Sequence, residues 1–444
     1  MGARLFGTDG IRGVANVDLT AELALDLAVS AAHVLIEHLH TGSRRPTALV
    51  GRDPRASGEF LEAAVVAGLA SAGVDVVRLD VVPTPAVAYL TAASGADLGV
   101  MLSASHNPMP DNGIKLFDSG GFKLADSVED EIEARLGEDW RRPVGAAVGR
   151  VRTDRPAVGR YLEHLLATLP HSLDGMRVVV DAAHGAAAEV APEALRRAGA
   201  EVIAIGAEPD GWNINDGYGS TYPERLSAAV LEHGADVGIA HDGDADRCLA
   251  VDATGELIDG DAILAICALA ERNAGRLVGN TVVTTVMTNL GFKHAMQAEG
   301  IGVVQTPVGD RYVLDAMRQR GFTLGGEQSG HVVFLDHATT GDGVLTALQL
   351  LGHTRAAGMP IRELAAVMTR LPQVLVNVKV IDQAAAMNDA AVRDEVAAVE
   401  ADLGGDGRVL VRPSGTEPLV RVMVEATTGE RARAAAERIA VLLR

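Results

Sequence analysis

The chain has 444 residues, of which 48% are hydrophobic and 22% charged, so it has ample apolar material for several cores and is not globally disordered. Its 39 Lys and Arg residues stand against 59 Asp and Glu residues, which gives a formal net charge of −20. This charge argues against nucleic-acid or anionic-membrane binding, because both need a basic surface. At roughly 150 residues per domain, the length alone predicts about three domains.

The cysteines and the N-terminus favour a cytoplasmic protein. Cys248 and Cys267 are too few for a disulfide framework or a thiolate metal site. The opening MGARLFGTDGIRG lacks the apolar stretch of a signal peptide, and no apolar run reaches the ~18 residues that a membrane span needs. We therefore expect no membrane partner.

The first 150 residues alternate short apolar runs with segments of helical spacing. Thr20 is a plausible N-cap for a first helix, and Pro83 and Pro85 are expected to break the chain. This alternation favours parallel strands joined by crossover helices. The expected strands are residues 48–50, 74–79 and 97–102, and a second helix is expected at residues 60–70.

The layout repeats twice more, and each round ends in a polar loop after a short apolar strand. Ligands of open α/β sheets bind beyond the carboxyl ends of strands, so the three loops are expected to face a shared cleft. In the second and third rounds, the expected strands are residues 177–181, 202–205, 237–240, 281–286 and 302–304, and the expected helices are residues 192–198, 223–233, 292–299 and 312–320.

The last part of the chain differs from these rounds. Residues 373–381 alternate valine with polar side chains, as a half-buried strand does, and an acidic surface helix is expected within residues 385–405. Strands at 409–411 and 419–424 and a final helix complete a small α+β domain. Pro372 marks a linker near residues 369–373.

Asp242, Asp244 and Asp246 form the strongest chemical signal. Carboxylates at alternate positions of an extended or tightly curved segment can converge, and three clustered anions repel unless a cation lies among them. All-oxygen ligands favour Mg²⁺ or Ca²⁺. An EF-hand is excluded, because Arg247 and Ala253 stand where that loop needs Gly and Glu. A solvated acidic turn is the alternative.

Ser105 follows the expected strand at residues 97–102. A serine at such a junction can be a nucleophile, a phosphorylation site or only a capping residue. The G-x-S-x-G pattern is absent. Adjacent His106 is expected to point to the opposite side of an extended chain, so we predict no hydrolase triad. The residues alone leave both a reactive and a structural serine open.

Two further loops carry groups suited to phosphate and sugar. Arg412–Pro418 places Arg, Ser and Thr around a glycine, with Arg421 on the next strand, which fits an anion-binding nest and an ordinary hairpin loop equally. Glu327–His331 offers hydrogen-bonding groups for sugar hydroxyls, although the residues alone favour a plain turn. Arg12 and Lys115 are either basic site residues or surface charges.

Six motifs resemble those of the α-D-phosphohexomutase superfamily, and the first and fifth resemble its glucosamine branch. They occur in the family's order over nearly the whole chain, which makes the set far more specific than any single motif. The motifs are FGTDGIRG at residues 6–13, SASHNP at 103–108, DNGIK at 111–115, DGDADR at 242–247, GEQSGH at 326–331 and RPSGTEP at 412–418.

The resemblance implies an α/β fold with three similar mixed-sheet domains and a mobile C-terminal α+β domain around a central cleft. Each domain would contribute one loop, for the phosphoserine, the metal, the sugar and the phosphate in that order. The domains are expected at residues 1–150, 151–253, 254–370 and 371–444.

The resemblance also implies a role for each loop. Ser105 would carry the phosphoryl group as an activating phosphoserine, and one of its oxygens would bind one Mg²⁺ ion together with Asp242, Asp244 and Asp246. Arg247 would be a neighbour of that site and not a ligand.

The remaining roles fall on the other loops. Glu327 and Ser329 would bind sugar hydroxyls, while charge stabilisation or proton transfer would fall to Arg12, Lys115 and His331 with no split among them. The residues that would bind the distal phosphate are Arg412, Ser414, Gly415, Thr416 and Arg421.

The reaction implied is the interconversion of glucosamine 6-phosphate and glucosamine 1-phosphate through a 1,6-bisphosphate, which would feed UDP-N-acetylglucosamine and cell-wall precursor synthesis. The expected partner is therefore a small phosphosugar, held where a cation and basic side chains locally reverse the acidic field. A homodimer is left open. The alternatives are a hexose phosphate mutase, a metal-dependent phosphatase and a non-catalytic phosphosugar sensor.

Overall fold

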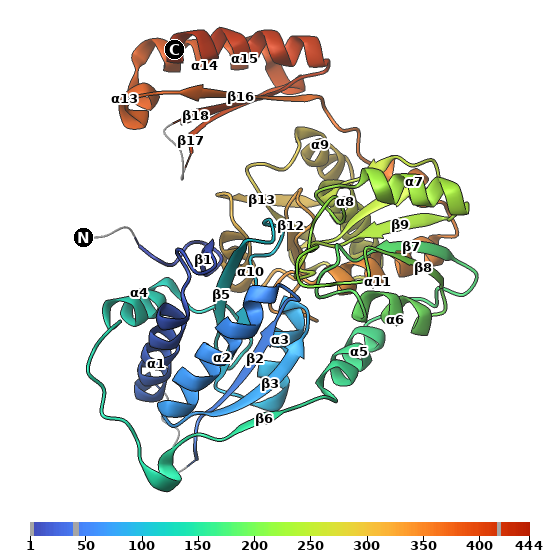
Figure 1. The fold of residues 1–444 in the computed structure, drawn as a ribbon. Helices are drawn as coiled ribbons and strands as arrows, with labels where there is room; N and C mark the ends of the chain where they lie inside the picture. The colour runs from blue at the N-terminus through green and yellow to red at the C-terminus, as the bar shows by residue number, and fades with distance from the viewer. Residues whose placement is uncertain (1–3, 39–43, 415–418) are drawn as a thin grey trace. The chain divides into compact units, whose positions relative to one another are not determined.

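The computed structural model describes residues 4–38, 44–414 and 419–444 (Figure 1). The chain forms two compact units. The first comprises Met1–Met287 and Gly302–Ala365, and the second comprises Thr288–Ile301 and Ala366–Arg444. The described residues form four sheets, three in the first unit and one in the second.

The first sheet has six strands in the order β1-β5-β4-β2-β3-β6. Its elements are β1 (Ile11–Val14), α1 (Ala21–His38), β2 (Thr47–Arg52), α2 (Ala56–Ser71), β3 (Asp75–Val81), α3 (Thr84–Ser94), β4 (Leu98–Leu102), β5 (Asp111–Phe117), α4 (Asp126–Ala134) and β6 (Val151–Thr153). Strands β2, β3, β4 and β6 pair in parallel, whereas β5 is antiparallel to both β4 and β1. The expected crossover strands are therefore present, with an antiparallel edge.

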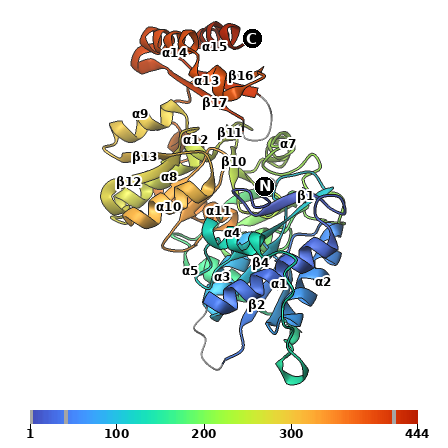
Figure 2. The same ribbon diagram turned by 90° about the vertical axis from the view of Figure 1, so that its left-hand side faces the viewer.

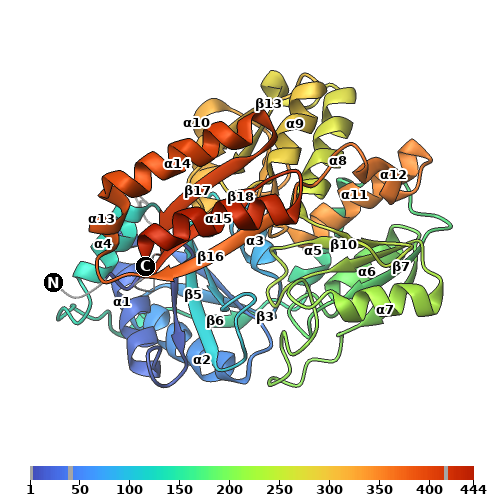
Figure 3. The same ribbon diagram turned by 90° about the horizontal axis from the view of Figure 1, so that it is seen from above.

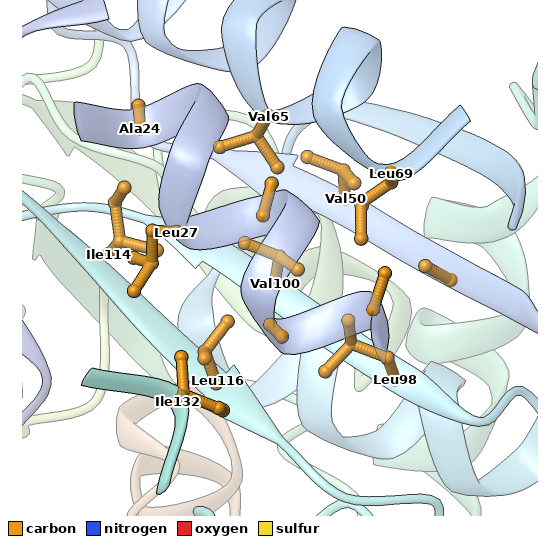
Figure 4. Close-up of a cluster of buried hydrophobic side chains, with 14 of the residues drawn as sticks. Ala24, Leu27, Val50, Val65, Leu69, Leu98, Val100, Ile114, Leu116 and Ile132 are labelled. Carbon is orange, nitrogen blue, oxygen red and sulfur yellow. The ribbon is translucent and has the colours of Figure 1, made fainter. Parts of the chain in front are cut away.

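Helices α1, α2 and α4 bury their apolar sides against one face of this sheet. Leu27 of α1, Val65 of α2 and Ile132 of α4 meet Val50 and Val100 of the strands in one cluster (Figure 4). Burying such a side chain contributes roughly 1.5–3 kcal/mol, so this cluster is a main source of stability for the first domain.

The N-termini of α1 and α3 test two expectations from the sequence, the N-cap at Thr20 and the break at Pro83 and Pro85. The N–H of Leu23 donates to Thr20 Oγ1 at 3.2 Å, which confirms Thr20 as the N-cap of α1. Where a break was expected, α3 instead begins at Thr84 with Pro85 in its first turn. Proline is tolerated there because the first N–H groups of a helix have no partner inside it.

The second sheet has the order β11-β10-β9-β7-β8. Its elements are α5 (Ala157–Ala167), β7 (Arg177–Asp181), α6 (Val190–Arg197), β8 (Glu201–Ile205), α7 (Glu224–His233), β9 (Val237–Ala240), β10 (Leu249–Asp252) and β11 (Leu257–Ile258). β7 is parallel to β8 and β9, and β9 is antiparallel to β10. Helix α7 lies along this sheet (Figure 3).

The third sheet has the order β13-β12-β14-β15. Its elements in the first unit are α8 (Gly260–Asn273), β12 (Thr281–Thr285), β13 (Gly302–Thr306), α10 (Asp310–Arg320), β14 (Leu324–Gly326), β15 (Val332–Phe334), α11 (Gly343–Ala357) and α12 (Ile361–Ala365). β12 is parallel to β13 and β14, and β14 is antiparallel to β15. Helices α8 and α10 lie beside these strands (Figure 2).

One structural device recurs in all three sheets. A parallel strand near the centre turns back into an antiparallel neighbour, as β4 does into β5, β9 into β10 and β14 into β15. The three turns contain residues 103–110, 241–248 and 327–331. They are the loops that the sequence singles out, so the expected mixed sheets of similar design are confirmed.

The second unit contains a three-stranded antiparallel sheet in the order β16-β18-β17. Its elements are α9 (Leu290–Ala298), β16 (Gln373–Lys379), α13 (Gln383–Asn388), α14 (Ala390–Leu403), β17 (Arg408–Pro413), β18 (Leu419–Glu425) and α15 (Gly429–Leu443). The expected acidic helix is α14, which buries Val392, Val399 and Leu403 against the sheet together with α15. The α+β design of this part is confirmed.

The domain boundaries stay a prediction. Strand β6 pairs with β3 of the first sheet although it lies past residue 150, and β11 pairs with β10 although it lies past residue 253. Across the described residues, no helix is both long and apolar enough to cross a membrane.

Candidate active site

The three aspartates of the β9–β10 turn converge. One carboxylate oxygen from each of Asp242, Asp244 and Asp246 lies within 4.8 Å of the others, and all three side chains are buried. The loop is curved, because Ala245 has a φ of 58°, in the left-handed region. The three carboxylates therefore converge, as the sequence suggested, because the loop is curved.

The triad holds more negative charge than its surroundings neutralise. Burial raises the pKa of Asp242 well above its usual value, and the charges of Asp246 and Asp244 raise it further. The pKa of Asp246 is also raised, first by burial and then by Asp244. Burial opposes ionisation of Asp244 too, but Lys115 outweighs it and holds that pKa at about 2. A cation among the three would relieve this repulsion.

The carboxylate oxygens of the triad that have no hydrogen-bond partner fit a hard divalent cation. Lys115 Nζ lies 2.8 Å from Asp244 Oδ2, and Thr84 Oγ1 donates to the same oxygen at 2.5 Å. Asp244 Oδ1 and Asp246 Oδ1 are buried with no hydrogen-bond partner among the described residues. Buried polar atoms are normally satisfied, and oxygen-only donors suit Mg²⁺ or Ca²⁺. The buried triad therefore fits a metal site.

Ser105 lies directly against this triad. Its side chain is 1% exposed, and Oγ donates to Asp242 Oδ2 at 2.5 Å. Its backbone has a φ of 53°. Such a conformation costs a non-glycine residue about 1–2 kcal/mol, so Ser105 is held in place by its surroundings.

The expectation that His106 would point away from Ser105 is wrong. His106 Nδ1 lies 3.3 Å from Ser105 Oγ, because the left-handed backbone at Ser105 removes the alternation of an extended chain. Burial lowers the pKa of His106 to about 4, helped by the charge of Arg247. Its imidazole is therefore neutral near pH 7. Only its adjacency to Ser105 could have suggested this contact.

Lys115 and Arg12 belong to the same buried centre and are not surface charges. Lys115, on β5, lies 2.8 Å from both Asp244 Oδ2 and Asp9 Oδ2. Burial would lower its pKa, but the carboxylates of Asp244 and Asp9 outweigh burial and raise it. Arg12 also pairs with Asp9. Both cations are thus permanently charged, which suits charge stabilisation better than proton transfer.

Three charged residues that sequence reasoning missed complete this centre. Lys123 pairs with Asp9 and with Asp310 at the start of α10, and so joins the first and third sheets. Asp310 Oδ2 in turn lies 3.6 Å from His331 Nε2. The FGTDG motif contained Asp9, but no spacing in the sequence relates it to residues 123 and 310.

The β14–β15 turn places its polar groups beside the other two loops. Glu327 Oε1 accepts from the N–H of Gly309 at 3.3 Å, and burial raises the pKa of Glu327. Ser329 Oγ is buried with no hydrogen-bond partner among the described residues. Together with His331, these groups are oriented without being saturated, as a sugar-binding loop requires.

One pocket of about 400 Å³ is lined by residues from all three loops. Its lining includes Arg12, His106, Asp246, Arg247, Glu327 and His331. Arg247 borders the triad, since its backbone N–H donates to Asp242 Oδ1 at 3.3 Å and its Nε forms long ion pairs, at 4.0 Å with Asp242 Oδ2 and 3.9 Å with Asp246 Oδ1. A larger hollow of about 640 Å³ contains none of the predicted site residues, so the smaller pocket is the better candidate.

The phosphate loop lies in the second unit. Arg412 and Arg421 stand opposite each other on β17 and β18, and Arg421 Nη2 donates to Ser414 Oγ at 3.4 Å. Burial and the charge of Arg421 lower the pKa of Arg412. Neighbouring cations of this kind favour an anion between them. Gly415 and Thr416 lie outside the described residues.

Comparison with known proteins covers almost the whole chain. Four domain models of one family match in succession: phosphoglucomutase/phosphomannomutase alpha/beta/alpha domain I at residues 3–141, domain II at 159–255, domain III at 259–371 and the C-terminal domain at 375–442.

Individual relatives agree with these models. Over 442 residues the chain is 66% identical to a protein named phosphoglucosamine mutase from Streptomyces griseus, covering 98% of each chain. A protein of that name from Acidothermus cellulolyticus is 66% identical over 441 residues, which cover 99% of this chain and 96% of that protein. The crystal structure of a phosphoglucomutase/phosphomannomutase family protein from Burkholderia thailandensis has the same fold, with a TM-score of 0.81, 24% identity, and coverage of 100% of this chain and 98% of that one.

Proposed function

Because the chain belongs to the phosphoglucomutase/phosphomannomutase family, we propose that it is an isomerase that interconverts glucosamine 6-phosphate and glucosamine 1-phosphate. The observation that carries this function is the buried Ser105 Oγ, 2.5 Å from Asp242 in a triad of aspartates. The amino sugar as substrate is supported by the name of relatives that are 66% identical over the full chain.

The reaction proceeds in two transfers through Ser105. Phosphoserine 105 donates its phosphoryl group to the free hydroxyl of glucosamine 6-phosphate, which gives glucosamine 1,6-bisphosphate and a free serine hydroxyl. The bisphosphate then turns over in the pocket and returns its other phosphoryl group to Ser105, which releases glucosamine 1-phosphate. Each step forms one P–O bond and breaks one, so the enzyme ends as it began.

The three aspartates would hold Mg²⁺, which when bound neutralises charge on the phosphoryl group. Lys115 and Arg12 add fixed positive charge beside it, since pairing with Asp9 keeps the buried Lys115 and the half-buried Arg12 oriented. His106, in contact with Ser105, and His331, in the β14–β15 turn, are the imidazoles placed to hold or move a proton.

The sugar and its second phosphate are bound by the two remaining loops. Glu327 and Ser329 bind the hydroxyls, for which the unpartnered Ser329 Oγ is one ready group. The distal phosphate is bound by Arg412, Ser414, Gly415, Thr416 and Arg421. Because the bisphosphate intermediate stays bound at this second site, transfer of its phosphoryl group back to Ser105 is favoured over hydrolysis.

Substrate preference and Ser105 phosphorylation test this function. The ratio of kcat/KM for glucosamine 6-phosphate to that for glucose 6-phosphate should clearly exceed one. A preference for glucose 6-phosphate would mean that the substrate is a hexose phosphate and not the amino sugar. Release of inorganic phosphate as fast as isomer formation would instead indicate a phosphatase. Intact mass of the protein incubated with glucosamine 1,6-bisphosphate should rise by ~80 Da at Ser105.

A further inference from the structure

A buried arginine binds the backbone of the serine loop. Arg55, at the start of α2, is 0% exposed. Its guanidinium donates to three carbonyl oxygens of this one loop, those of Ser105 at 3.0 Å, Asn107 at 2.8 Å and Pro108 at 2.6 Å. A planar fork of N–H groups is suited to holding several acceptors in a fixed geometry.

The counter-ion of this arginine is linked, through Ser103, to the other backbone group of Ser105. Asp53 is also 0% exposed, and its Oδ2 accepts from Arg55 Nε at 2.9 Å and from Ser103 Oγ at 2.6 Å. Ser103 Oγ in turn accepts from the N–H of Ser105 at 2.9 Å. The network therefore binds both the N–H and the carbonyl of Ser105, the two groups on either side of its φ and ψ.

The second sheet's domain supplies a matching donor. Asn215, which is 5% exposed, donates from Nδ2 to the carbonyl of Ser105 at 2.9 Å and to that of Asn107 at 3.1 Å. Its own N–H donates to the carbonyl of Ala183 at 2.8 Å, which anchors it to the turn after β7. Arg55 and Asn215 thus grip the same two carbonyls from different domains.

We propose that Arg55 and Asn215 are positioning residues that hold Ser105 in its left-handed conformation and so direct its oxygen at the aspartate triad. This inference rests on the proposed function of Ser105 as the phosphoryl carrier. Neither residue lines the 400 Å³ pocket. They act through the carbonyl of Ser105, because without them the strained backbone relaxes to an ordinary conformation and carries Oγ away from Asp242.

The test compares Asn215→Ala and Arg55→Lys with a matched control. Gln349→Ala removes a comparably buried amide, whose Nε2 donates to the carbonyl of Thr168 at 2.7 Å outside the site. Lysine keeps the charge at position 55 but not the fork. We expect kcat to fall at least about 10-fold in both site variants, since a displacement near 1 Å can cost about 100-fold. KM for glucosamine 6-phosphate should change less than about threefold, because no substrate contact is lost.

A second measurement follows the serine itself. The rate at which Ser105 gains a phosphoryl group from glucosamine 1,6-bisphosphate, read by intact mass, should fall in parallel with kcat, while Gln349→Ala should match the parent in both. Folded Asn215→Ala with parental rates overturns the inference, as does a loss of kcat no larger than that of Gln349→Ala. If the parent itself gains no phosphoryl group at Ser105, the proposed function fails and this inference fails with it.

Discussion

The serine loop after β4 and the aspartate loop after β9 solve similar problems with the same backbone device. Each joins a parallel strand to an antiparallel neighbour, and each contains a non-glycine residue in the left-handed region, Ser105 with a φ of 53° and Ala245 with a φ of 58°. In the first loop the strained residue is itself the proposed phosphoryl carrier. In the second an alanine takes the strained position, and the aspartates on either side are brought together.

The two loops differ in which residue has the strained, left-handed backbone. An alanine at the bend leaves all three carboxylates free to converge, whereas in the serine loop the residue at the bend is itself the proposed phosphoryl carrier. The serine loop accordingly has donors to its carbonyls from Arg55 and Asn215. The aspartate loop has Lys115 and Thr84 on Asp244. The carbonyls of Gly243, Asp244 and Ala245 also accept hydrogen bonds, but from backbone N–H groups of other segments. The serine loop differs because buried side chains donate to its carbonyls.

The largest effect is expected from removing the reactive group of the first loop. Ser105→Ala should lower kcat by more than about 10³-fold, because no other side chain can carry the phosphoryl group. Steady-state kinetics with glucosamine 6-phosphate measures this loss. Ser30→Ala is the control, since Ser30 is equally buried and only donates to the carbonyl of Ile132 at 2.7 Å. Near-parental turnover of Ser105→Ala would refute the carrier.

The second effect concerns metal binding by the aspartate loop. Asp244→Asn should raise the Mg²⁺ concentration for half-maximal activity by about 10-fold or more, because it removes a charge from the cation's donor set and from Lys115. A Mg²⁺ titration of the EDTA-treated enzyme tests this. Asp252→Asn, on β10 of the same hairpin, should leave the Mg²⁺ requirement as it is. An unchanged requirement in Asp244→Asn would count against the triad.

A smaller effect is expected where the two loops touch. A Cβ added at Gly243 would lie 2.6 Å from the carbonyl oxygen of Ser105, so Gly243→Ala must push the loops apart. We expect it to lower the free energy of unfolding by about 1–3 kcal/mol, measured by urea denaturation, and to reduce activity. Gly159→Ala in α5, where a Cβ meets open space, should be neutral or slightly stabilising. If both variants have the same free energy of unfolding and the same activity, the contact between Gly243 and the serine loop can be widened without cost.

The smallest effect tests the strain itself. Ala245→Gly should change the free energy of unfolding by less than about 1 kcal/mol, because relief of the left-handed penalty offsets the greater freedom of the unfolded chain. Ala31→Gly in α1 should cost about 1 kcal/mol or more, since Ala31 is helical and fully buried. A loss at position 245 as large as that at position 31 would mean that Ala245 carries no strain.

Much of the fold could be predicted because its signals are local. Strand β9 has the bounds that its apolar run predicts, and the hydroxyl of Thr20 caps α1 as its position before an apolar helix indicates. The turns that contain Ser105, Asp242 and Glu327 were also identified, since each follows a short apolar strand. Helix α3 is not among the expected helices, because Pro83 and Pro85 predict a break, whereas Pro85 in fact lies in the first turn of this helix.

The sequence by itself determined which loops contain the candidate site residues, since residue types and motif order are properties of the chain. Only the tertiary structure decided how those loops face one another. The approach of His106 to Ser105 depends on one dihedral angle, and the partners Lys123, Asp310 and Asn215 come from distant segments. No spacing in the chain encodes such contacts. They arise because burial of charged and strained groups is stable only where other parts of the fold supply their partners.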